Sequence, residues 1–224
     1  RGQLVELAAR YGLPFQEPPA SSLGVGEAWV LLYERQRGSG LTGRICFGAG
    51  YAADVHCAPD SKLALQDAFF ALQGLAASKL RRLPTHVDVQ RCAVALPLAS
   101  GPIEGGSLGL GAIALLSVAL NQPAPSDLAA TARLRTDGTL HPVQHLQAKI
   151  EALLRRHPEV KRVLVAQGQP CGFSMSPAIE IRECATLEDA IIETGLDISA
   201  LEAATLETFE GRLQQLICVE SVQS

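Results

Sequence analysis

The centre of this sequence is the stretch Gly101-Pro102-Ile103-Glu104-Gly105-Gly106-Ser107-Leu108-Gly109, which places one serine among glycines directly before an uncharged apolar run at residues 110–120. Glycines let a backbone approach a ligand closely. The first N–H groups of a helix have no partner within the helix, so they can face an oxygen that carries negative charge. The stretch therefore predicts a loop that leads into a buried helix at 108–120, with Ser107 beside either an oxyanion hole or a phosphate site.

Strand and helix patterns alternate on both sides of this stretch. On the N-terminal side they predict strands at 28–33 and 43–47 around a hairpin turn at 38–40, a strand ending near 57, an amphipathic helix at 61–80, and one kinked strand formed by 86–89 and 92–96. On the C-terminal side they predict strands at 129–134, 140–143, 160–166 and 179–182, a helix at 144–157 and a helix capped by Thr186. This interleaving predicts an α/β (α+β) fold with mixed sheets and packed helices.

The 224 residues, 47% of them hydrophobic, are enough to bury a core. We expect one domain at residues 25–197, preceded by a proline-rich helix end and linker at 1–24 and followed by a helical extension at 198–224. Because the first residue is Arg1 and not methionine, we expect the chain to be part of a longer protein.

Composition argues against several classes of partner. The net charge is −4 and the basic residues are scattered, so we do not expect nucleic acid as a partner. The longest apolar run is much shorter than the roughly 20 residues that span a bilayer, so we expect no membrane association. The cysteines show no C-x-x-C spacing and lie mostly in apolar segments, which predicts reduced core thiols in a cytoplasmic protein. They are Cys46, Cys57, Cys92, Cys171, Cys184 and Cys218.

Lys149 stands out in the helix predicted at 144–157. The apolar stripe of that helix is formed by Leu146, Ile150, Leu153 and Leu154. Lys149 lies at the edge of the stripe, where burial disfavours its charged form. A neutral amine beside a serine hydroxyl is a competent general base, as in Ser-Lys dyads. Lysines at such edges usually extend their charge to water, and serines between glycines usually form turns, so periodicity alone leaves the role of both residues open.

Two segments of the chain resemble the Lon peptidases. The run Pro102-Ile103-Glu104-Gly105-Gly106-Ser107-Leu108-Gly109 resembles their nucleophile motif Pro-Lys-Asp-Gly-Pro-Ser-Ala-Gly. The segment Thr131-Ala132-Arg133-Leu134-Arg135-Thr136-Asp137-Gly138-Thr139-Leu140-His141-Pro142-Val143-Gln144-His145-Leu146-Gln147-Ala148-Lys149 is similar, without a gap, to Thr-Gly-Glu-Ile-Thr-Leu-Arg-Gly-Glu-Val-Leu-Pro-Ile-Gly-Gly-Leu-Lys-Glu-Lys, which ends on the catalytic base of that family. The resemblance covers about residues 54–196.

The resemblance implies a Lon-like proteolytic domain fold and a Ser-Lys serine peptidase. Ser107 matches the nucleophile, Lys149 the general base and Thr131 the threonine that helps to hold the lysine. No cofactor or metal is implied. The implied partners are protein or peptide substrates, an ATPase or sensor domain elsewhere in the full-length protein, and further copies of the chain in a homo-oligomer. No G-x-x-x-x-G-K-[ST] phosphate loop is present, so the ATPase of typical Lon proteins is absent from these residues.

The chain also departs from the family around the dyad. The Gly-Glu after the threonine is Ala132-Arg133 here, the Gly-Gly before the lysine helix is Gln144-His145, and the proline before the serine is Gly106. These changes imply a reshaped substrate groove.

Three functions are compatible with these patterns. We favour a serine endopeptidase that cleaves peptide bonds in protein substrates without an ATPase of its own. The first alternative is a catalytically silent Lon-like domain that serves as a scaffold or in oligomerisation, which the changes around the dyad support. The second is phosphoryl transfer to a small molecule, because the glycine loop at 105–111 also resembles the phosphate loop of GHMP kinases.

Overall fold

The structure is a computed structural model that describes residues 22–35, 37–46, 59–79, 93–95, 106–171 and 178–197. Several predictions concern residues outside these ranges: the strand ending near 57, the strand at 86–89, the helical extension at 198–224 and nearly all of the linker at 1–24. Cys57, Cys92 and Cys218 also lie outside the described residues.

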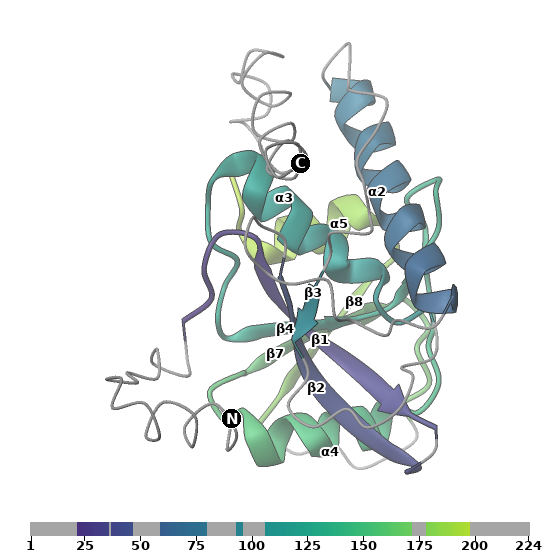
Figure 1. The fold of residues 1–224 in the computed structure, drawn as a ribbon, viewed down its shortest axis with the longest axis vertical. Coiled ribbons are helices and arrows are strands. Elements are labelled where there is room, and N and C mark those ends of the chain that lie inside the picture. The colour runs from purple at the N-terminus through teal and green to yellow at the C-terminus, as the bar shows by residue number, and fades with distance from the viewer. Residues whose placement is uncertain are drawn as a thin grey trace, which may run out of the picture.

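Six strands of the described chain form one mixed sheet in the order β3-β2-β1-β4-β7-β8 (Figure 1). Their bounds are β1 Glu27–Glu34, β2 Ser39–Cys46, β3 Ala93–Ala95, β4 Leu128–Thr131, β7 Arg162–Ala166 and β8 Glu180–Cys184. Strands β1, β2 and β3 pair antiparallel, whereas β1, β4, β7 and β8 run parallel. Strand β1 therefore joins an antiparallel half to a parallel half, and the predicted mixed α/β character is confirmed.

Helices cover both faces of this sheet. Helices α2 (Pro59–Lys79), α3 (Ala112–Leu120) and α5 (Leu187–Thr194) lie on one face, and α4 (Leu146–Arg156) lies on the other (Figure 1). The cap predicted at Thr186 is confirmed, since its hydroxyl accepts a hydrogen bond from the Asp189 N–H (3.2 Å) and the Asp189 carboxylate accepts one from the Thr186 N–H (2.9 Å). One hydrophobic core connects the elements between Leu23 and Leu196.

Residues 108–117 of the apolar run after Ser107 are buried, as predicted, but its first turn differs from an α-helix. Residues Gly109–Gly111 form the 3₁₀ helix η2, and the α-helix begins only at Ala112. A Cβ at Gly109 would lie 2.7 Å from the Leu134 Cβ and 2.9 Å from the Ala132 carbonyl oxygen. This turn therefore packs directly against the chain that follows β4, at a distance that only glycine permits.

The strand predicted at 129–134 is interrupted. Strand β4 ends at Thr131, and Ala132 forms an isolated parallel bridge with Leu108. The chain then forms β5 (Arg133–Leu134), which pairs antiparallel with β6 (Leu140–His141) across a turn at 135–139. Because Ala132 pairs with the residue after Ser107, the interruption brings the serine turn beside the end of β4.

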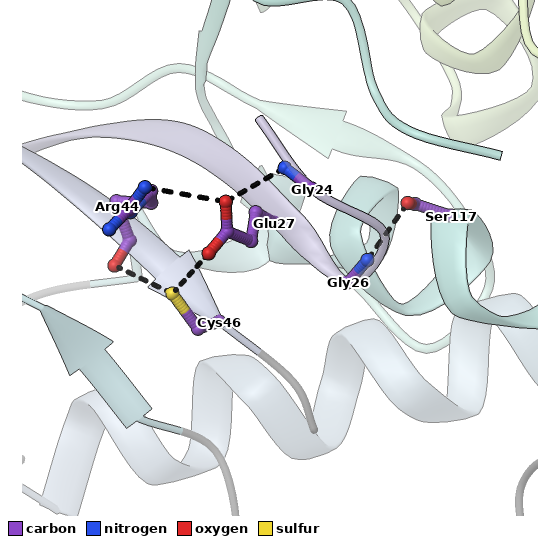
Figure 2. Close-up of polar contacts among 6 residues, drawn as sticks. All are labelled: Gly24, Gly26, Glu27, Arg44, Cys46 and Ser117. Atoms are coloured by element: carbon purple, nitrogen blue, oxygen red, sulfur yellow. Dashed lines mark hydrogen bonds and ion pairs between the residues drawn. The ribbon is translucent and has the colours of Figure 1, made fainter. Parts of the chain in front are cut away.

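Polar contacts join the start of β1 to strand β2 and to helix α3 (Figure 2). The Glu27 carboxylate accepts hydrogen bonds from the Gly24 N–H (2.8 Å) and the Cys46 thiol (3.6 Å), and lies 3.4 Å from Arg44 Nη1. On the other side, the Gly26 N–H donates to Ser117 Oγ in α3 (3.0 Å). Strand β2 and the helix that follows Ser107 are thus held to the same end of β1.

Two of the predicted core thiols are confirmed. Cys46 and Cys184 are buried free cysteines, and the half-buried Cys171 is also free. Burial raises the pKa of Cys46 to about 12, with a further contribution from Glu27, and raises that of Cys184 to about 11. Both thiols are therefore protonated and chemically inert at neutral pH.

Helix α4 lies against strand β2 at Gly40. A Cβ at this position would lie 2.6 Å from the Lys149 backbone nitrogen and closer still to the Ala148 carbonyl. Real Cβ atoms do not approach backbone atoms so closely, so any larger residue would force α4 away from the sheet. Gly40 thus determines how near Lys149 lies to the sheet.

We predict that Gly40→Ala destabilises the protein by about 2 kcal/mol, because the added methyl group overpacks the contact between helix and strand. Urea unfolding followed by circular dichroism measures this change. The control is Gly74→Ala in α2, where nothing lies within 4 Å of the added carbon and the better helix former should raise stability by up to about 1 kcal/mol. Equal stabilities of the two variants would contradict the close packing of α4 on β2.

Candidate active site

A cavity of about 550 Å³ opens at the edge of the sheet where β1 and β4 end. The carboxyl ends of parallel strands meet at one edge of a sheet, and ligands of α/β proteins bind there. Residues from α2, from the end of β1, from the serine turn, from β5 and from the chain leading into α4 line this cavity. They are Tyr33, Arg35, Leu63, Ala64, Asp67, Gly106, Ser107, Arg133, Pro142, Val143, Gln144, His145 and Lys149.

Ser107 lies in the turn before η2 and on the wall of this cavity. Its side chain is largely enclosed, with 4% of the residue exposed, and its hydroxyl has no hydrogen-bond partner among the described residues. Two N–H groups that the sequence offered for an oxyanion hole are already bonded, because Gly109 donates to the Gly106 carbonyl (3.2 Å) and Gly111 to that of Leu108 (2.8 Å). The Ser107 hydroxyl is therefore free to bind a ligand in the cavity, whereas the N–H groups of Gly109 and Gly111 are not.

Lys149 lies deeper than the edge position predicted for it. Only 2% of the residue is exposed, because α4 is in close contact with β2 at Gly40. Within the described part of the chain, no carboxylate forms an ion pair with its amine. Burial lowers the pKa of Lys149 from 10.5 to about 8, since removal from water disfavours the ammonium form.

Thr131 lies beside the Lys149 amine. Lys149 Nζ donates a hydrogen bond to Thr131 Oγ1 (3.4 Å), and the Thr131 hydroxyl donates its own proton to the Leu31 carbonyl in β1 (3.1 Å). Because the threonine proton is already used, Thr131 can only accept from the lysine. When Lys149 is neutral, its lone pair is therefore free to accept a proton from another group.

The structure thus brings two of the three predicted site residues into direct contact. Thr131 and Lys149 are hydrogen-bonded, and Ser107 shares the cavity wall with Lys149. No hydrogen bond joins Ser107 to Lys149 among the described residues. The arrangement places an amine of lowered pKa and a free hydroxyl on the wall of one cavity, and serine activation needs both groups.

His145 is a cavity residue whose importance the sequence signalled only as a departure from the Lon motif. Its φ of 59° lies in the left-handed region, which few residues other than glycine adopt readily. The imidazole stacks on the Tyr33 ring, with centroids 3.8 Å apart and an interplanar angle of 10°. This contact fixes the chain at the first turn of α4, where the Lys149 N–H donates to the His145 carbonyl (3.2 Å).

Gln169 is a supporting residue that no sequence pattern identified. Its buried side-chain amide accepts a hydrogen bond from the Val143 N–H (2.8 Å) and donates one to the Val143 carbonyl (2.9 Å). The pair of bonds mimics the pairing of two strands and holds the cavity segment that precedes α4. A glutamine after β7 carries no local signal of such a contact, because its partner lies far away in the sequence.

No family model matches this chain, and the search of curated proteins returned no match either. Among the described residues, no helix combines the length and apolar character needed to cross a bilayer. In the same residues, no three histidine, cysteine or carboxylate side chains gather as metal ligands would.

We predict that Lys149→Met stabilises the protein by up to about 3 kcal/mol at pH 7, because it removes a desolvated amine and keeps the length of the side chain. Between pH 8 and 10.5 the unfolded lysine binds a proton that the folded one has lost, so wild-type stability rises with pH and the difference closes. Urea unfolding at several pH values from 7 to 10.5 measures this.

The matched control is Lys161→Met, which removes an exposed lysine and should change the unfolding free energy by no more than about 0.5 kcal/mol. A difference between wild type and Lys149→Met that stays constant over this pH range would show that the amine remains in contact with water.

Proposed function

We propose that this chain is a serine endopeptidase domain, similar to the proteolytic domain of Lon peptidases, in which Ser107 is the nucleophile and Lys149 the general base. The observation that carries the proposal is the buried Lys149 amine, which is hydrogen-bonded to Thr131 and lines the same cavity as Ser107. With a pKa of about 8, roughly a quarter of this lysine is neutral at pH 7.5, compared with about one part in a thousand for a lysine at 10.5.

The proposed reaction proceeds in two stages. As Ser107 Oγ attacks the peptide carbonyl carbon, its proton passes to Lys149 Nζ. The C–N bond then breaks, the ammonium returns that proton to the leaving amine, and an acyl ester remains on Ser107. In the second stage a water molecule loses a proton to Lys149 Nζ and attacks the ester carbonyl carbon. The ester C–O bond then breaks, the ammonium returns that proton to Ser107 Oγ, and the carboxyl product leaves.

The departures from the Lon motif also support the proposal. His145 stands where that family has a glycine, and its left-handed backbone is a conformation that glycine adopts without strain. Gly106 and Arg133 both replace residues of the family motif, a proline and a glutamate. The two residues are in contact, since a Cβ at Gly106 would lie 2.9 Å from Arg133 Cγ. Both differences thus fit a Lon-like backbone at these positions.

A silent scaffold remains the second candidate, and two observations favour it. Ser107 and Lys149 are not directly hydrogen-bonded among the described residues, and the serine is largely enclosed. Catalytic hydrogen bonds are, however, often long before substrate binds. We therefore favour the peptidase. We propose that an ATPase or sensor domain elsewhere in the full-length protein delivers its protein substrates. We also propose that it is a homo-oligomer in the cytoplasm, where free buried thiols such as Cys46 are expected.

We predict that a fluorophosphonate labels Ser107, as located by peptide mass spectrometry. The labelling rate should rise with pH through about 8 and level off above it, because only the neutral lysine can accept the serine proton. Lys149→Met should slow labelling at least a hundredfold, and Ser107→Ala should abolish it. Absence of any label in the wild type, or unchanged labelling of Ser107 in Lys149→Met, would favour the silent scaffold.

Two substitutions at Thr131 test whether its hydroxyl matters as the hydrogen-bond acceptor for Lys149. Thr131→Ser keeps the hydroxyl, whereas Thr131→Val keeps the shape and removes both the acceptor for Lys149 and the donor to Leu31. We expect the valine variant to label at least about tenfold more slowly and the serine variant to stay within a fewfold of wild type. Equal rates for the two variants would show that the hydroxyl takes no part.

A further inference from the structure

Arg133 lies directly beside the serine turn. It belongs to β5, and its aliphatic stem runs along Gly106, where an added Cβ would lie 2.9 Å from Arg133 Cγ and 3.1 Å from Cδ. Because Gly106 has no side chain, the arginine can cross the residue that immediately precedes Ser107. The side chain is exposed and lines the cavity.

The charge of Arg133 is not matched within the described residues. No ion pair involves Arg133 there, although Asp67 lines the same cavity. Arg162 shows what a matched arginine looks like in this protein, since its guanidinium binds both oxygens of Asp127, at 3.1 and 3.0 Å. The guanidinium of Arg133 thus offers a positive charge to a negatively charged ligand in the cavity, where Asp67 supplies the one carboxylate among the described lining residues.

We infer that Arg133 binds an acidic side chain of the substrate next to the scissile bond. The inference rests on the proposed peptidase function. A planar guanidinium with free N–H groups binds a carboxylate through two parallel hydrogen bonds, which an uncharged amide cannot reproduce with equal strength. The contact with Gly106 determines the position, because a group bound by Arg133 lies near the bond that Ser107 attacks. Arg133 is therefore a specificity residue and takes no part in bond breaking.

Internally quenched peptides test the inference. The peptides are identical except for one residue within three positions of the scissile bond, which is Glu, Gln or Lys. We expect wild-type kcat/KM to favour Glu over Gln by about tenfold or more at one of these positions. Arg133→Gln should abolish this preference, and Arg133→Glu should reverse it in favour of Lys. The matched control, Arg135→Gln, changes an exposed arginine two residues further on that does not line the cavity, and should keep the wild-type preference.

The outcomes separate this inference from the proposed function. If the wild type cleaves the Glu and Gln peptides equally, or if Arg133→Gln keeps the preference, the inference is wrong and the peptidase stands. If no peptide is cleaved and Ser107 is not labelled by a fluorophosphonate, the proposed function is wrong and the inference falls with it. A reversed preference in Arg133→Glu cannot arise from misfolding, because it requires an active variant.

Discussion

The contact between the backbone of α4 and Gly40 of β2 constrains the whole candidate site. It sets the distance between the helix and the sheet at the residue where the chemistry is expected, because the Lys149 nitrogen is one of the atoms in contact. Because the helix lies so close to the sheet, the Lys149 side chain cannot reach bulk water. Its amine is enclosed by α4 and the end of β4, at the wall of the cavity. The hydrogen bond to Thr131 then fixes the direction in which the enclosed amine donates.

Helix α4 tolerates the buried Lys149 amine because its apolar side chains are well packed. Desolvation of the Lys149 amine costs about 3 kcal/mol at neutral pH. The same helix buries Leu146, Ile150 and Leu153, and each fully buried side chain of this kind contributes about 2 kcal/mol. Apolar burial therefore exceeds the desolvation penalty, and the helix can hold a lysine that weakens the fold.

The sequence predicted those parts of the fold that depend on local periodicity. The hairpin of β1 and β2, helix α4 and the Thr186 cap were all found in this way, and the mixed α/β class followed from them. The depth of Lys149 was underestimated, because it depends on Gly40, which is distant in sequence and has no side chain to form a pattern. The interruption at Ala132 and the contact of Gln169 with Val143 were missed for the same reason, since each is defined by a partner elsewhere in the chain.

The contact between Gln169 and Val143 also limits how a polypeptide can lie in the cavity. Extended peptides often bind enzymes as an additional strand, through hydrogen bonds to an exposed backbone edge. The only N–H of Val143 is occupied by the glutamine side chain, so this residue cannot donate to a guest strand. A polypeptide lying along this wall would therefore need a hydrogen-bond donor other than the Val143 N–H.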